Sequence, residues 1–345
     1  MTNTQKALLY IIRLGLQNEP DKDFPNSVDW GILFKMSIQH GVNAIVADGL
    51  QLHKEIQIPQ EFKIQKLQWL GTIMQMERRY EKQNQIVDNL TSYLQKQCID
   101  IMILKGQPLS FYYPNPNHRP VGDIDIFAFG DYEKINQLIE SHGEHVEYES
   151  DKHSVFFFNG VMVENHQTLF DISHSKIEKI TESFISKDKK GNILTKKGFY
   201  IPNPQCNYLF LLRHLAKHFG DNEGINLRQV IDFGLFLYNN KKNIDIELAR
   251  KVLSSTKLTK INNIFVSIAQ EITGHDLSVF IWGQIDHKIK NKVFDEIFYH
   301  PINETNTIGF AYFFEKIKII FSQKWKYDLL PESFFSRIRR AWRKM

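Results

Sequence analysis

The sequence predicts an α+β fold in which a small mixed β-sheet lies between two helical regions. Three observations favour this class. Apolar residues at helical spacing fill the first part of the chain, strand-like and helical segments alternate in the middle, and helical periodicity returns after Pro202 and Pro204. We expect an N-terminal helical region at 1–97, an α/β core at 98–200 and a C-terminal helical region at 201–345.

The N-terminal region is predicted to consist of amphipathic helices. Residues 4–17 and 30–52 carry apolar side chains at helical spacing, and the stretch 61–97 is long, periodic and free of proline. These helices are expected to pack together or to cover the core. In the C-terminal region, helix is predicted from near Gln205 onward in several segments.

The core begins with an apolar run at 99–104, which predicts a buried strand that ends before Gly106. A helix is expected near 107–113, and a loop rich in proline and asparagine at 114–120 leads to a second strand that opens at Asp123. The remaining predicted core elements are a helix at 131–142 and strands near 145–148, 154–159 and 161–168.

Two carboxylates open the second strand. Successive side chains of a strand point to opposite faces, so Asp123 and Asp125 project from one face, roughly 7 Å apart at their backbones. Two such carboxylates raise each other's pKa, and a hard divalent cation bound by both relieves that cost. On the strand at 161–168, Glu164 and His166 share a face, so Glu164 is expected to complete an acidic triad if this strand neighbours the first.

The turn after the first strand predicts a phosphate site. Gly106 lacks a Cβ, which lets the backbone approach a ligand, and the N–H groups that open the following helix attract anions. Arg119, at the end of the proline-rich loop, is placed to meet a phosphate.

These residues together resemble a known family. Leu104-Lys105-Gly106, a helix containing tyrosine, Arg119, the Asp-Ile-Asp-Ile sequence at 123–126 and the Val-Glu-Asn-His sequence at 163–166 resemble the polymerase-beta-type nucleotidyltransferase superfamily. More narrowly, they are similar to the bacterial family called uncharacterised nucleotidyltransferase. The resemblance covers about residues 98–235.

The resemblance implies an enzyme that moves a nucleoside monophosphate from a nucleoside triphosphate such as ATP to an acceptor hydroxyl, with release of pyrophosphate. Asp123, Asp125 and Glu164 would be the catalytic residues and would bind one or two Mg²⁺ ions. Gln107 stands where the superfamily usually has glycine or serine, and whether Ser110 supplies the missing hydroxyl stays open. The implied nucleotide-binding residues are Lys105, Gly106, Gln107, Ser110 and Arg119.

A second group of polar residues follows the core. His214 and His218 are four residues apart and share a helix face, a spacing that can bind zinc. The zinc-protease pattern, however, requires glutamate directly after the first histidine, where this chain has Leu215. We therefore expect supporting roles, or contact with the acceptor, for His166, His214, His218, Arg228 and Asp232.

Composition narrows the alternatives. A net charge of +4 over 345 residues gives no strong case for nucleic-acid binding, and no apolar stretch reaches the roughly 18 residues of a membrane span, so a cytoplasmic protein is expected. Two alternative functions remain: a noncatalytic nucleotide-binding or antitoxin-like regulatory module of the same fold, and an interaction scaffold built on the helical flanks. The sequence identifies neither the acceptor nor the nucleobase nor the oligomeric state.

Overall fold

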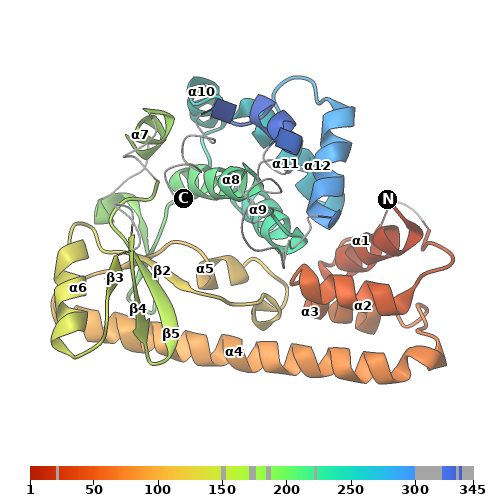
Figure 1. The fold of residues 1–345 in the computed structure, drawn as a ribbon, viewed down its shortest axis with the longest axis horizontal. Helices are drawn as coiled ribbons and strands as arrows, with labels where there is room; N and C mark the ends of the chain where they lie inside the picture. Colours follow the sequence, from red (N-terminus) through yellow and green to blue (C-terminus); the bar gives the residue numbers. More distant parts are fainter. Residues whose placement is uncertain are drawn as a thin grey trace, which may run out of the picture.

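The structure, a computed structural model, confirms the α+β class, with a mixed β-sheet surrounded by helices (Figure 1). It describes residues 1–20, 23–148, 153–170, 176–183, 188–220, 224–299, 321–331 and 334–335. The long helix α4 runs along one side of the molecule, from the N-terminal helices at one end to the sheet at the other (Figure 1).

The helices of the described residues fall before, within and after the sheet. Short 3₁₀ turns, among them η2 (Pro116–His118), connect some of them. The α-helices are α1 (Asn3–Gly15), α2 (Trp30–Gln39), α3 (Asn43–Leu52), α4 (Lys63–Gln95), α5 (Gln107–Ser110), α6 (Tyr132–Ser141), α7 (Lys176–Ser183), α8 (Pro204–Gly220), α9 (Leu227–Asn240), α10 (Ile246–Ser255), α11 (Thr259–Thr273) and α12 (His287–Tyr299).

The described strands form one seven-stranded sheet in the order β3-β4-β5-β2-β1-β7-β6. The pairs β2–β5 and β1–β7 are parallel, and the other neighbouring pairs are antiparallel. The strands are β1 (Met102–Ile103), β2 (Ile124–Phe127), β3 (Glu147–Tyr148), β4 (His153–Phe158), β5 (Val161–His166), β6 (Ile193–Leu194) and β7 (Tyr200–Ile201).

The two faces of the sheet pack against different helices. One face buries isoleucines such as Ile124 and Ile126 against apolar residues of α4 and α6, including Leu90 and Ile135. Because side chains alternate along a strand, Asp125 points to the opposite face. That face looks toward α8 and α9, whose apolar residues belong to a larger core shared with the N-terminal helices.

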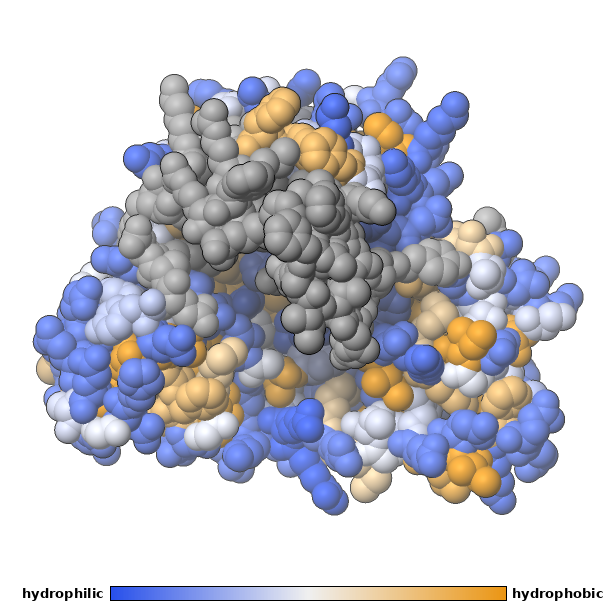
Figure 2. Space-filling model, in the orientation of Figure 1, coloured by the Kyte–Doolittle hydropathy of each residue, from blue (hydrophilic) through white to orange (hydrophobic). Residues whose placement is uncertain are grey.

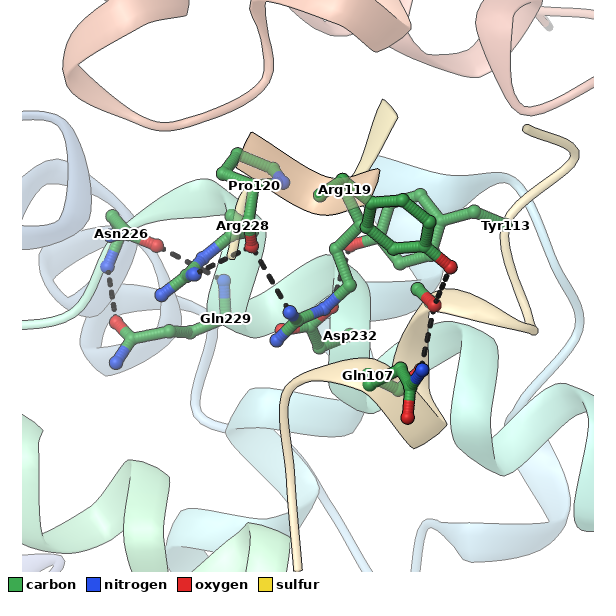
Figure 3. A network of polar contacts seen from close by, with 10 residues as sticks. Gln107, Tyr113, Arg119, Pro120, Asn226, Arg228, Gln229 and Asp232 are labelled. Atoms are coloured by element: carbon green, nitrogen blue, oxygen red, sulfur yellow. Dashed lines mark hydrogen bonds and ion pairs between the residues drawn. The ribbon is translucent and has the colours of Figure 1, made fainter. Parts of the chain in front are cut away.

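Local sequence signals fix the start of α9. Asn226 accepts a hydrogen bond from the backbone N–H of Gln229, and the Gln229 side chain accepts one from the backbone N–H of Asn226 (Figure 3). This capping box satisfies two amide groups that a helix otherwise leaves without partners. It determines where Arg228 and Asp232, in the first turns of α9, come to lie.

Most predicted elements are confirmed, with shifted ends. The helices α4 and α6 and the strands β4 and β5 lie where the periodicity placed them. The expected strand at 99–104 pairs only over Met102–Ile103, and the helix expected at 107–113 ends at Ser110. The predicted helical stretch 30–52 is two helices, because Gly41 adopts a φ of +64° between them.

The surface seen in Figure 2 is mainly hydrophilic, with apolar atoms gathered over the strands β3–β5 at the left and over the N-terminal helices at the right. The exposed apolar residues of these strands include Tyr148, Phe157 and Met162. Of the helices that the structure describes, none is both long enough and apolar enough to cross a membrane.

Candidate active site

The pairing of β2 with β5 brings two of the predicted carboxylates together. In this parallel pair, Asp125 lies opposite Glu164, and neighbouring strands are about 4.8 Å apart. Both side chains point to the face of the sheet that looks toward α8 and α9. The strand neighbourhood that the triad required is therefore present.

Asp123 lies one residue before β2 and is linked to Asp125 through a lysine. The Lys105 Nζ atom is 3.1 Å from Asp125 Oδ1 and 3.5 Å from Asp123 Oδ2. Lys105, which the sequence suggested as a nucleotide-binding residue, thus lies among the carboxylates in this structure.

His166 lies between the carboxylates of Asp125 and Glu164. Its Nε2 atom is 3.1 Å from Asp125 Oδ1 and 3.3 Å from Glu164 Oε2, and its side chain is buried. A second histidine, His153 on β4, packs near it with ring centroids 5.3 Å apart. The sequence left the role of His166 open, and the structure makes it part of the carboxylate cluster, which we define as Lys105, Asp123, Asp125, Glu164 and His166.

The charged groups of this cluster shift one another's pKa values. Burial by itself would raise the pKa of Asp125, but the Lys105 ammonium and the His166 ring hold that pKa well below its usual range. Burial, helped by the charge of Asp125, raises the pKa of Asp123. The pKa of Glu164 is lowered despite its burial, because of the hydrogen bond with His166. For Lys105, the neighbouring carboxylates outweigh burial and raise the pKa.

The cluster has the ligands for a metal ion. Asp125, Glu164 and His166 each offer one ligand atom, and these atoms all lie within 4.8 Å of one another. The Asp125 Oδ2 atom is buried and has no hydrogen-bond partner in the structure, which suits an oxygen that binds a cation. The sequence predicted Asp123 in this set, and the structure places His166 in it.

The cluster opens into a cavity of about 530 Å³ between the sheet and the helices α8 and α9. Cavities of this size typically bind a small molecule or cofactor. The helical side of the cavity carries histidines, other polar residues and apolar side chains. Its polar residues include His214, Lys217, His218, Arg228, Gln229 and Asp232.

His214 and His218 line this cavity with their rings in contact, the centroids 4.4 Å apart. Burial raises the pKa of Asp125, and the charge that His214 would carry helps to lower it, to a smaller extent than Lys105 and His166 do. Among the described residues, the set that could hold a metal is Asp125, Glu164 and His166, and it includes neither of these histidines. Their predicted supporting or acceptor-contact role remains a prediction.

Arg119 forms a buried network on the α9 side of the cavity (Figure 3). Its Nε and Nη2 atoms donate to the two carboxylate oxygens of Asp232, both at 2.8 Å. Tyr113 donates its hydroxyl to Asp232 Oδ1 at 2.6 Å. We call these three residues the arginine cluster; its guanidinium lines the cavity while already bonded to a carboxylate.

The turn at Gly106 also lines the cavity. Its φ of +77° belongs to the region that favours glycine. Gln107 and Ser110 are buried behind the turn: Gln107 donates to Asn84, and the Ser110 hydroxyl donates to the Gln107 carbonyl. The cavity lining includes Gly106 but neither of these two side chains.

Sequence reasoning missed three polar residues of the cavity, His153, Lys217 and Gln229. A signal for His153 was present. Asn159 and Gly160 both have positive φ and form a two-residue hairpin turn, a common role for Asn-Gly. Counting back from that turn pairs His153 with His166, as the structure shows. No comparable local signal marks Lys217.

One comparison with known proteins identifies a family. The model of a family described as "Uncharacterised nucleotidyltransferase" matches residues 26–274. Among solved structures, that of the antibiotic-resistance factor ANT(2'')-Ia matches with a TM-score of 0.37 and 9% identity, over 56% of this chain and 99% of that one. At that score the likeness supports no conclusion. A search of curated proteins found no match. Because the family model covers most of its length, this chain belongs to the uncharacterised nucleotidyltransferase family.

Proposed function

We propose that the protein is a metal-dependent nucleotidyltransferase that moves a nucleoside monophosphate from a nucleoside triphosphate to an acceptor hydroxyl and releases pyrophosphate. The observation that carries the proposal is the register of β2 and β5, which sets Asp125 beside Glu164 at the edge of a cavity. The buried Asp125 Oδ2 atom, which has no hydrogen-bond partner, supports a cation at that place.

The residues that would hold one or two Mg²⁺ ions are Asp125 and Glu164, with Asp123 and His166 beside them. When bound, such ions neutralise the charge of the phosphates and of the leaving pyrophosphate. Asp125 and Glu164 are ready for this role at neutral pH, because the pKa of each is lowered and the carboxylates are ionised.

Lys105 and Glu164 have distinct roles in this proposal. The Lys105 ammonium is partly exposed to the cavity and can pair with a phosphate oxygen of the triphosphate. Glu164 takes up the proton that the acceptor hydroxyl loses. His166, held between two carboxylates, orients Glu164 through their hydrogen bond.

The other predicted contacts belong to the same proposal. Gly106 lets the backbone approach the phosphates, while Gln107 and Ser110 would hold the turn from behind. Arg119 lines the cavity and would add positive charge there, although Asp232 offsets it. ATP is the donor to test first.

A noncatalytic nucleotide-binding or regulatory module of the same fold is the second candidate, and one observation favours it. The Lys105 ammonium lies between the carboxylates of Asp123 and Asp125, where it supplies positive charge of its own. If that ammonium excludes a divalent ion, the site would bind a nucleotide without transferring it.

The identity of the broken bond tests the proposal. We would incubate α-labelled ATP and Mg²⁺ with excess protein and a panel of hydroxyl compounds, with water as the default acceptor. Cleavage between the α- and β-phosphates, lost in Glu164→Gln and retained in the exposed control Glu133→Gln, is the expected result. Release of ADP and phosphate would contradict the proposal, and binding without any cleavage would support the second candidate.

A further inference from the structure

The two walls of the cavity carry opposite charge. The sheet wall brings three carboxylates, one lysine and two histidines, His153 and His166. On the helical wall, the described residues of α8 and α9 bring Lys217, Arg228, two histidines and one carboxylate, Asp232. The helical wall therefore has an excess of cations facing the ligand.

Asp232, the one carboxylate that these residues of the helical wall contribute, already has hydrogen-bond partners. Both oxygens of Asp232 accept hydrogen bonds from Arg119, and one of them also accepts the Tyr113 hydroxyl. A carboxylate held by a two-bond contact with one guanidinium is close to fully neutralised. Asp232 therefore leaves the charge of Arg228, one helical turn before it, largely uncompensated.

Arg228 is the unusual residue of this wall. Among the described residues its guanidinium forms no ion pair, and the one hydrogen bond of that group is a long one, 3.4 Å from Nη1 to the Pro120 carbonyl (Figure 3). That carbonyl also accepts a bond from Arg119 at 3.1 Å. Burial, together with the charge of Arg119, lowers the pKa of Arg228. A partly buried guanidinium without a paired anion is costly, and a bound anion removes that cost.

We propose that Arg228, on the cavity wall that also carries Lys217, forms a subsite for an anionic group of the acceptor, so that the acceptor carries a phosphate or carboxylate and is not a polycation. The inference rests on the proposed function, because it names the class of the second substrate. The remaining donors of the Arg228 guanidinium suit the two-pronged recognition of a phosphate or carboxylate.

The position of Arg228 separates this subsite from the metal-binding carboxylates while keeping it near them. Arg228 lies on α9, across the cavity from β2 and β5, yet it is close enough to Asp123 for the two charges to interact. An acceptor held there by its anionic group would present a neighbouring hydroxyl toward the reacting phosphate. The alternative source of the anion is the triphosphate itself, and binding experiments distinguish the two.

The test uses inorganic phosphate as the probe. By calorimetry, we would titrate phosphate into the full chain, alone and with saturating Mg²⁺ and the non-hydrolysable analogue α,β-methylene-ATP. The variants are Arg228→Gln, Arg228→Lys and Arg250→Gln, the last removing an exposed arginine on α10 that does not line the cavity. Spermidine, titrated in the same way, tests a cationic acceptor.

We expect phosphate to bind with similar affinity with and without the analogue. We expect about 10- to 100-fold weaker binding in Arg228→Gln, an intermediate loss in Arg228→Lys and no change in Arg250→Gln. Competition between phosphate and the analogue would assign Arg228 to the triphosphate and overturn the inference. Equal phosphate binding by Arg228→Gln, absence of phosphate binding, or preferential binding of spermidine would also overturn it.

The same data keep this inference apart from the proposed function. If the analogue fails to bind wild type, the nucleotidyltransferase proposal fails, whatever phosphate does. If the analogue binds wild type but phosphate does not bind alongside it, the acceptor subsite fails and the nucleotide site stands. Thermal unfolding of Arg228→Gln and Arg228→Lys shows whether each variant is folded before its affinity is interpreted.

Discussion

The carboxylate cluster on the sheet and the arginine cluster beside α9 border the same cavity but differ in how their charges are satisfied. In the arginine cluster, both oxygens of Asp232 have partners and every charged side chain is buried. In the carboxylate cluster, one oxygen of Asp125 has no hydrogen-bond partner, and three carboxylates share the charge of Lys105. A closed network holds a fold together, whereas a network with an unmet buried oxygen is suited to a ligand.

The largest expected effect is at the open cluster. Asp125→Asn should lower nucleotidyl transfer by about 10³-fold or more, equivalent to about 4 kcal/mol, because a metal ligand is lost. The fold should persist, since Lys105 keeps Asp123 as a partner. Transfer assays and circular dichroism would measure both effects, with the exposed Asp88→Asn as control. A fully active Asp125→Asn enzyme would contradict the assignment of the carboxylate cluster as the ligand-binding cluster of the two.

The closed cluster should respond in the opposite way. Arg119→Met leaves the buried Asp232 carboxylate without its main partner and should lower the free energy of unfolding by about 3–5 kcal/mol. The double variant Arg119→Met/Asp232→Asn should recover part of that loss, because no buried charge is left unpaired. Denaturant unfolding measures both, and an Arg119→Met variant as stable as wild type would show that this cluster is not structural.

A matched pair of glycines tests the backbone beside the open cluster. Gly106→Ala should cost about 1–3 kcal/mol, because its φ of +77° and ψ of −110° strain a residue with a Cβ. A steric clash does not cause this loss of stability, since the nearest atom to a Cβ added at Gly106 would be 3.8 Å away. Gly71→Ala, inside α4 and with open space around it, should instead stabilise by about 0.5–1 kcal/mol. Equal effects in thermal unfolding would refute the strain.

A third ion cluster gives the smallest expected effect. His118 lies 2.7 Å from Asp48 on α3 and 3.0 Å from Glu77 on α4, and these hydrogen bonds and charges raise its pKa. The cluster is more exposed to water than the other two, so its contribution should be about 1 kcal/mol or less.

The sign of its pH dependence follows from the raised pKa. The contribution of His118 is fully present below the unfolded pKa of about 6.5 and is lost as pH rises through the higher folded value. The difference in melting temperature between wild type and His118→Gln should therefore shrink as pH rises from about 5.5 to 8.5. A difference that grows over that range would contradict this assignment.

The parts of the molecule that the sequence predicted are those governed by local patterns. Alternation located β2, β4 and β5, so the approach of Glu164 to Asp125 followed once those two strands became neighbours. The length and periodicity of 61–97 located α4. The bounds and pairing of the short strands β6 and β7 escaped prediction, because two residues carry no period and the pairing of β7 with β1 is a tertiary contact.

Local patterns could not predict which side chains pair when they are far apart in the sequence. Arg119 and Asp232 are 113 positions apart. Arg119 was predicted to meet a phosphate and Asp232 to have a supporting role or to contact the acceptor, and no local signal shows that they bond to each other. The same holds for Lys105, whose place between two carboxylates depends on how β1 pairs with β2. The sequence predicted that the acidic residues would lie together. Which cation neutralises which carboxylate could be seen only in the structure.

The most direct test of the carboxylate cluster as a nucleotide site is calorimetric titration of ATP into the full chain, with and without Mg²⁺. Wild type is compared with an Asp123→Asn/Asp125→Asn double variant that circular dichroism shows to be folded. The account predicts ATP binding that depends on Mg²⁺ and is lost in the double variant. Absence of binding by wild type, or equal binding by both proteins, would contradict it.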